Sequence, residues 1–341
     1  MVTGDRPADP PAGDADVLSA ELERVLLGDS MRYTRRDLAE RSGVPVEEGR
    51  RLWRAMGFAE VADDDAVFTD GDLEALRTAT DLLRDGLLDA GSLVALTRAL
   101  GQSMARLAEA ELEQLEAALD VGLDRDGAAR LAREVLPKVQ QLVVYVWRRQ
   151  LAAAATRRLA ADVDQHQLVV CFADMSGFTG ISRELPDLEL AQLIESFEAV
   201  AADLVAAAGG RVVKTVGDEV LFVAARPEAA AEAALRLVDA AEDDSVLPPV
   251  RAGLAYGTVL SRIGDVYGTV VNLASRLTSV ARPGSVLVDL RMADALAADG
   301  RFQLHRTPRF AVRGFPHLQP TRLRWAEDSA PARSGEASPA G

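Results

Sequence analysis

The 341-residue chain has little cysteine and little lysine. Its one cysteine, Cys171, excludes an internal disulfide framework and favours a reducing, cytoplasmic setting. Among its 38 basic residues only Lys138 and Lys214 are lysines, so a lysine at a motif position is informative. The sequence has no uninterrupted run of about 20 apolar residues, which argues against a transmembrane segment. Its acidic, proline-rich start, residues 1–16, lacks the basic and apolar regions of a signal peptide.

The charge and the length narrow the class of protein further. A formal net charge of -15 argues against wholesale binding of nucleic acid. The length favours two domains. Proline, serine, glycine and alanine are frequent in residues 1–15 and 327–341, so both ends are expected to be disordered tails.

Residues 16–136 show a helical periodicity. Leucines recur at three- and four-residue spacings, as at Leu93, Leu96 and Leu100, which predicts amphipathic helices packed on one another. Breaks between short helices are expected at Gly86, Gly91, Gly101 and Gly122. A longer helix with Pro137 in its first turn is expected over residues 137–165, and it leads directly into the second half of the chain.

Residues 166–326 show a mixed pattern of short apolar runs and helical segments. The expected elements are a strand at 168–175, a helix at 188–208, strands at 211–216 and 219–225, a helix from 227, a strand at 250–259, a helix at 270–280 and a strand at 285–289. The predicted fold class is therefore α+β, with an all-helical N-terminal domain followed by a ferredoxin-like βαββαβ domain.

The first motif with chemical content is FADMSGFT, residues 172–179. Asp174 ends an apolar strand and precedes a short turn into a helix, an arrangement that suits a metal ion and a phosphate group. The alternative is that Asp174 only caps the following helix.

The second motif is VVKTVGDEVLF, residues 212–222. Gly217 and Asp218 form the expected hairpin turn, where Gly-Asp is also a common structural choice. Two carboxylates at strand ends, Asp174 and Asp218, can hold two cations at the roughly 4 Å separation of two-metal phosphoryl chemistry. Lys214 places a compact charge on the same hairpin in a chain that otherwise uses arginine, although a solvated edge lysine is the plain alternative.

The third motif is GDVYGTVVNLASRL, residues 264–277. Asn272 and Arg276 are four residues apart and share one helical face, opposite the apolar stripe of Leu273 and Leu277. An ordinary exposed pair on an amphipathic helix would show the same spacing.

Together the three motifs resemble the class III nucleotidyl cyclases over roughly residues 167–325. The resemblance implies that Asp174 and Asp218 bind two Mg²⁺ or Mn²⁺ ions, and that Lys214 and Asp265 recognise the purine. Lysine only donates and ionised aspartate only accepts hydrogen bonds, which fits adenine N1 and its 6-amino group and rejects guanine.

The resemblance also implies the remaining roles. Asn272 orients the ribose, and Arg276 stabilises charge on the α-phosphate as pyrophosphate leaves. Arg313 sits where family members often place a basic residue for the terminal phosphates. Since the family takes the metal-binding aspartates from one subunit and the other residues from its partner, the expected assembly is a head-to-tail homodimer that converts ATP to cyclic AMP.

Residues 31–58 look like a helix-turn-helix of the MerR type, with its turn at residues 42–45. Trp53, Met56 and Phe58 are expected in its core. A DNA-binding interpretation would place five arginines on phosphates: Arg35, Arg36, Arg50, Arg51 and Arg54. The interleaved acidic residues, with the run at residues 63–65, argue against nucleic acid as a partner.

The whole N-terminal region resembles the helical, autoinhibitory regulatory domain of actinobacterial, pH-responsive cyclases. The signals consistent with that resemblance are a small molecule, a lipid or a proton. Three functions stay open at this point: a regulated adenylyl cyclase, which the motifs favour, a nucleotide sensor without turnover, and a transcription regulator that borrowed a cyclase-like domain.

Overall fold

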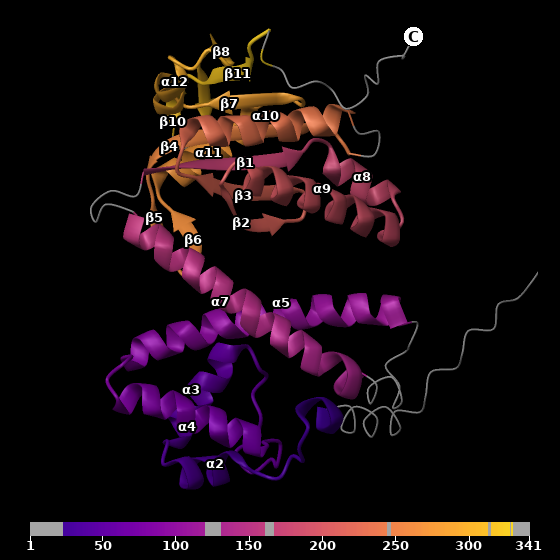
Figure 1. Ribbon diagram of the computed structural model, residues 1–341, viewed down its shortest axis with the longest axis vertical. Coiled ribbons are helices and arrows are strands. Elements are labelled where there is room, and N and C mark those ends of the chain that lie inside the picture. The colour runs from indigo at the N-terminus through magenta and orange to yellow at the C-terminus, as the bar shows by residue number, and fades with distance from the viewer. Residues whose placement is uncertain are drawn as a thin grey trace, which may run out of the picture. The chain divides into compact units, whose positions relative to one another are not determined.

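The computed structural model describes residues 23–119, 131–160, 167–243, 247–312, 315–327 and 329. The chain forms two compact units, Met1–Thr156 and Arg157–Gly341 (Figure 1). The tail predicted at residues 1–15, and most of the one predicted at 327–341, lie outside the described residues. None of the described helices is both long enough and apolar enough to cross a membrane.

The first unit is helical, as predicted. Its described helices include α2 (Arg35–Ser42), α3 (Val46–Met56), α4 (Asp70–Arg84) and α5 (Ala90–Leu119). Helix α7 (Leu136–Ala160) follows a π-helical turn, η1 (Leu131–Val135), and its last residues, from Arg157, belong to the second unit. The predicted turn between α2 and α3 is confirmed, because Gly43 ends α2 in the left-handed conformation at φ 74°. Thr34 begins α2 with a capping box, in which its side chain accepts from the Asp37 amide.

Gly101 does not break a helix, so that prediction is wrong. Helix α5 continues through Gly101, whereas Gly91 lies in its first turn, just after the interruption between α4 and α5. A Cβ at Gly101 would lie 2.6 Å from the carbonyl carbon of Met56, so the glycine lets α5 approach the end of α3 closely. The break at Gly86 is confirmed at φ 68°, and Gly122 lies outside the described residues.

The core of the first unit is small. Leu38, Phe68 and Leu73 are buried together, with Trp53 packed edge-on against Phe68 at a ring-centroid distance of 5.0 Å. The Phe58 ring lies 4.4 Å from the Trp53 ring, measured between centroids, but Phe58 is 53% exposed. The prediction that Phe58 belongs to the core is therefore wrong.

The second unit is built on a seven-stranded sheet with the order β2-β3-β1-β4-β7-β11-β8. Its strands are β1 (Gln167–Met175), β2 (Arg211–Val216), β3 (Glu219–Ala224), β4 (Val250–Thr258), β7 (Ser285–Val288), β8 (Phe302–Arg306) and β11 (Thr321–Trp325). The part β4-β1-β3-β2 is antiparallel throughout, and the chain reaches it in the order βαββαβ. This confirms the predicted ferredoxin-like fold, which β7, β11 and β8 extend beyond β4.

Helices cover both faces of this sheet (Figure 1). Helices α9 (Asp187–Ala207), α10 (Pro227–Asp243) and α12 (Leu290–Leu296) pack on one face and α11 (Thr269–Val280) on the other. Strand β1 therefore buries side chains in both directions: Cys171 and Ala173 face α9 and α10, whereas Val170 and Phe172 face α11.

The chain before α9 and after β4 contains elements that the sequence did not predict separately. A short helix, α8 (Phe178–Glu184), precedes α9. Strands β5 (Leu260–Arg262) and β6 (Asp265–Tyr267) form a hairpin that carries Asp265, and β9 (Phe310–Val312) pairs with β10 (Phe315–Leu318).

Candidate active site

Three charged side chains form a row across the face of the sheet that α11 covers. Asp174 on β1 has Glu219 of β3 and Arg251 of β4 as its register partners. Directly opposed residues of antiparallel strands point to the same face. The row is therefore fixed by strand register, at the end of β1 where the chain turns into α8.

Asp174 forms an ion pair with Arg251. Arg251 Nε donates to Asp174 Oδ2 at 2.6 Å, and only 13% of the Asp174 side chain is exposed. Gly177, which has no capping side chain, is the N-cap of α8. Asp174 therefore does not cap the following helix, and its carboxylate lies at the strand end with Oδ2 paired to Arg251.

Asp218 lies in the two-residue turn between β2 and β3, as predicted, after Gly217 in the left-handed conformation at φ 59°. The Met175 amide donates to the Asp218 carbonyl at 3.0 Å, which holds this turn against the end of β1. Burial raises the pKa of Asp218, and the nearby negative charge of Asp174 and a hydrogen bond with Asp174 raise it further. The structure thus brings the two predicted metal-binding aspartates together.

The residues around Asp174 and Asp218 suit a divalent cation. Two adjacent carboxylates repel each other, and Mg²⁺ and Mn²⁺ prefer oxygen ligands. The Oγ atom of Ser176, in the turn just after Asp174, is buried without a hydrogen-bond partner. Within the described ranges no group of three His, Cys, Asp or Glu side chains is arranged to hold a metal ion. A magnesium-type site with one or two carboxylates, completed by substrate phosphates, needs no such cluster.

Lys214 and Asp265 form the second predicted pair. Lys214 Nζ lies 2.7 Å from Asp265 Oδ2, and the Val266 amide donates to Asp265 Oδ1 at 2.8 Å. Burial raises the pKa of Asp265, but the hydrogen bonds from Lys214 and Val266 and the charges of Lys214 and Arg211 outweigh it and hold that pKa below its usual range. The pair therefore presents one fixed donor and one fixed acceptor.

Helix α11 carries the other two predicted residues of the site. Asn272 is exposed and Arg276 is half-buried, while Ala274, Leu277 and Thr278 are buried against the sheet. Neither the Asn272 nor the Arg276 side chain has a hydrogen bond or an ion pair among the described residues. Both are free to meet a ligand, and Arg313 lies outside the described part of the chain.

Arg251, Glu219 and Ser176 were not predicted from the sequence. Burial, and then the charges of Asp174 and Asp218, raise the pKa of Glu219, so it belongs to the same electrostatic group. Arg251 had one available signal, a single charge within the otherwise apolar strand VRAGLAYGT. Glu219 and Ser176 lie inside the second and first motifs, but the place of Glu219 beside Asp174 depends on the pairing of β1 with β3.

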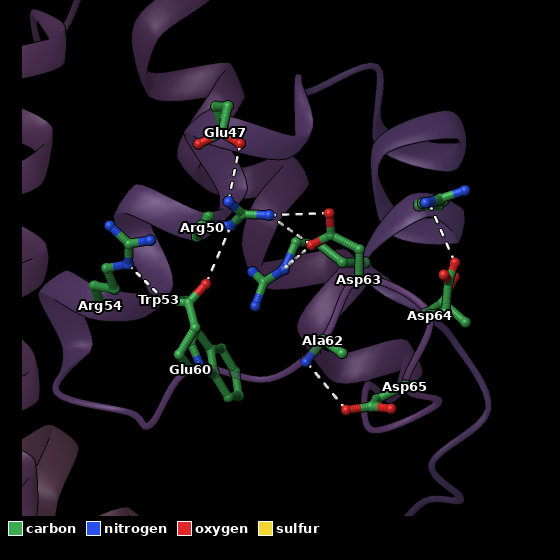
Figure 2. Close-up of polar contacts among 12 residues, drawn as sticks. Glu47, Arg50, Trp53, Arg54, Glu60, Ala62, Asp63, Asp64 and Asp65 are labelled. Atoms are coloured by element: carbon green, nitrogen blue, oxygen red, sulfur yellow. Dashed lines mark hydrogen bonds and ion pairs between the residues drawn. The ribbon is translucent and has the colours of Figure 1, made fainter.

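The arginines of the helix-turn-helix-like segment are engaged within the first unit (Figure 2). Arg50 contacts Glu47, Glu60 and Asp63, at 3.0, 3.1 and 2.7 Å. The other pairs are Arg54 with Glu60 at 2.6 Å, Arg35 with Asp63 at 3.3 Å and Arg36 with Asp64 at 3.2 Å. Four of the five arginines that a DNA-binding interpretation needs are thus neutralised by acidic side chains of the same unit.

The first unit also contains an apolar pocket of about 820 Å³ among helices α2 to α5. Its lining includes Leu52, Trp53, Leu82, Leu96 and Met104. A cavity of this size and chemistry suits an apolar ligand.

Comparison with known proteins supports both halves of the chain. Residues 162–323 match the Adenylate and Guanylate cyclase catalytic domain, and residues 12–151 match the Adenylate cyclase regulatory domain. The chain is 45% identical over 308 residues to an adenylate cyclase of Streptomyces coelicolor, covering 86% of this chain and 81% of that protein. It is 38% identical over 343 residues to an adenylate cyclase of Glutamicibacter nicotianae, covering 93% and 84%. It is 34% identical over 297 residues to a pH-sensitive adenylate cyclase of Mycobacterium tuberculosis, covering 81% and 74%.

These matches confirm the resemblance to cyclases that the three motifs indicated. Catalytic domains of this family depend on divalent metal ions, and they typically dimerise. The chain belongs to the adenylate cyclase family and joins an adenylate cyclase regulatory domain to a cyclase catalytic domain.

Proposed function

We propose that this chain is an adenylyl cyclase that converts ATP to 3′,5′-cyclic AMP and pyrophosphate, at sites shared between two copies in a head-to-tail homodimer. The observation that carries the proposal is that one domain contains both a pairing of Lys214 with Asp265 at 2.7 Å and a separate pair of carboxylates, Asp174 and Asp218. The first pair can recognise adenine and the second can hold cations. Both belong to elements that pack on the same sheet.

The proposed chemistry is an internal phosphoryl transfer. The ribose 3′ oxygen bonds to the α-phosphorus, the bond to the pyrophosphate oxygen breaks, and the hydroxyl proton is released. Two Mg²⁺ or Mn²⁺ ions, held by Asp174 and Asp218, would lower the pKa of the 3′-hydroxyl and neutralise the triphosphate. Asn272 would orient the ribose and Arg276 would stabilise charge on the α-phosphate.

Base recognition rests on hydrogen-bond polarity. The Lys214 ammonium donates to adenine N1 and the Asp265 carboxylate accepts from the 6-amino group. Guanine has a donor at N1 and an acceptor at C6, so each protein group would face a group of its own kind. Arg313 is proposed to contact the terminal phosphates.

The proposed assembly is supported by the unpaired side chains of Asn272, which is exposed, and Arg276, which is half-buried. Neither side chain contacts the Asp174 and Asp218 pair within the described residues, and the family typically dimerises. A partner copy would therefore supply Lys214, Asp265, Asn272 and Arg276 to the metal-binding aspartates of this one. A monomer is expected to be inactive, and the single cysteine favours a cytoplasmic setting.

One assay tests the enzymatic proposal. Purified full-length protein is incubated with Mn²⁺ and either ATP or GTP, and the cyclic products are measured. We expect cyclic AMP from ATP, and we expect Asp218→Ala to abolish it. Absence of cyclic AMP from both the full-length protein and a truncated protein that begins at Gln165 would favour a nucleotide sensor without turnover. Specific binding to a DNA fragment would favour a transcription regulator.

The N-terminal domain is proposed to regulate the catalytic domain. Its apolar pocket of about 820 Å³ supports a lipid or another apolar small molecule as the signal, and the pH-sensitive relative makes the proton a second candidate. Helix α7 is continuous from Leu136 to Ala160, and in the sequence only residues 161–166 separate it from β1, so we propose that it transmits the state of this domain. Equal turnover and equal pH profiles for the full chain and a chain that begins at Gln165 would contradict this role.

A further inference from the structure

A β-bulge in β2 brings two cations onto one face of the sheet. Arg211 pairs with Val223 and Val212 with Phe222, but Lys214 pairs with Leu221, so Val213 is an extra residue. In a regular strand, residues three positions apart point to opposite faces. Because of the bulge, Arg211 and Lys214 both point to the face that α11 and the β5–β6 hairpin share.

Both cations contact the tip of the β5–β6 hairpin. Lys214 Nζ pairs with Asp265 Oδ2 at 2.7 Å, and Arg211 Nη1 donates to the Gly264 carbonyl at 3.0 Å. Strand β6 lies beside β2 in the fold (Figure 1). Arg211 therefore contacts the peptide group immediately before Asp265, while Lys214 contacts the Asp265 side chain itself.

The hairpin tip is strained. Ile263 and Gly264 form the two-residue turn with φ of 52° and 79°. A turn with both central residues in the left-handed conformation favours asparagine, aspartate and glycine, and a β-branched residue there is an outlier. Such a conformation persists when its surroundings hold it in place. The hydrogen bond from Arg211 to Gly264 holds the second residue of this turn.

We infer that Arg211 is a positioning residue for base selectivity: it fixes the β5–β6 turn so that Asp265 keeps its place while Lys214 is drawn to the purine. The inference rests on the proposed function, since it assigns Asp265 and Lys214 to adenine. In the structure Lys214 itself holds Asp265. When a base takes up one of the Lys214 donors, Arg211 is the contact to the turn that does not change.

The experiment compares base selectivity in the full-length protein. The ratio of kcat/KM for ATP to kcat/KM for GTP is measured with Mn²⁺ for the wild type and for Arg211→Met, which keeps an apolar stem and loses the donor. The matched control is Arg262→Met, because Arg262 is exposed on β5 of the same hairpin and has no ion pair among the described residues. Circular dichroism checks the fold of each variant.

We expect the ratio to fall about tenfold in Arg211→Met, the scale of one lost hydrogen bond to a charged group, mainly through a higher KM for ATP. Arg262→Met keeps the wild-type ratio. A merely structural role for Arg211 would lower kcat/KM for both nucleotides equally, and an unchanged ratio therefore overturns the inference. Wild-type protein that forms no cyclic AMP overturns the proposed function itself, which is a different result.

A second variant covers a failure of Arg211→Met to fold. Arg211→Gln keeps a polar side chain, but its shorter amide does not reach the Gly264 carbonyl, so the same loss of selectivity is expected. If neither variant folds, Arg211 is a structural residue and the inference is wrong.

Discussion

Replacing Gly253 by alanine would displace the helix that carries Asn272 and Arg276. Gly253 lies on β4, on the face that α11 covers. A Cβ there would lie 2.6 Å from the Ala274 carbonyl oxygen and 2.7 Å from Leu277 Cβ, and closer still to the Thr278 amide nitrogen. Two of these three atoms are helix backbone, which cannot rotate away as a side chain could.

The size of the effect follows from these distances. Ordinary contact begins near 3.4 Å, so α11 has to retreat from β4 by about 1 Å. Overpacking of this kind costs about 1–3 kcal/mol, or about 2–12 °C in the melting temperature of a domain of this size. A misplacement of about 1 Å in groups that orient a substrate can lower turnover about 100-fold.

The assay measures cyclic AMP formation and thermal unfolding of the same full-length preparation. The control is Gly300→Ala, because a Cβ at Gly300 meets nothing within 4 Å and the residue lies between α12 and β8. We expect Gly253→Ala to lose far more turnover than stability, while Gly300→Ala keeps both. Wild-type turnover in Gly253→Ala at 25 °C would refute the argument that close packing of α11 on β4 sets the position of Asn272 and Arg276.

Three further predictions concern Asp218, the pair of Lys214 and Asp265, and Cys171. The pKa of Asp218 is higher in the folded protein than in the unfolded chain. Its protonated side chain therefore stabilises the fold fully at pH values below the pKa of the unfolded chain, and this contribution is lost as the pH rises through the pKa of the folded protein. Without metal, Asp218→Asn should therefore have a higher melting temperature than the wild type at pH 7 and the same one at pH 3, although the variant is inactive. Calorimetry without metal measures this, and a lower melting temperature for the variant at pH 7 would contradict it. Lys214→Glu combined with Asp265→Cys should move the preference from ATP towards GTP, and a double variant that still prefers ATP would contradict the assigned base contacts. Cys171 is fully buried and burial raises its pKa well above the usual range, so thiol reagents should label it only after denaturation.

The catalytic fold was predictable because its local signals agree. The sequence predicts a hairpin turn at Gly217 and Asp218 and the end of a helix at Gly209. In the structure both Gly217 and Gly209 have the left-handed conformation that such positions favour. The β5–β6 hairpin was missed because its strands have three residues each and Ile263 stands where a turn residue is expected. Local patterns carry no information about such an exception.

The candidate site was predictable only in part. Asp174, Lys214, Asp218 and Asp265 stand in recognisable motifs, and the structure joins them into the two expected pairs. Arg251 reaches Asp174 across 77 residues of sequence, through the pairing of β1 with β4. The register of those strands is set by packing on both faces of the sheet, which no short motif encodes. For the same reason the local pattern predicts a helix break at Gly101, although this glycine allows a close contact with Met56.

The β2–β3 hairpin has a consequence for how two sites would communicate. Lys214 and Asp218 are four residues apart on this one hairpin. In a head-to-tail pair of chains, Lys214 would serve the site of one chain while Asp218 serves the site of the other. A small tilt of a single hairpin would then alter substrate recognition in one site and cation binding in its twin simultaneously. The β2–β3 hairpin would thus couple the occupancy of the two sites, and a dimer with one site occupied would have its own turnover rate.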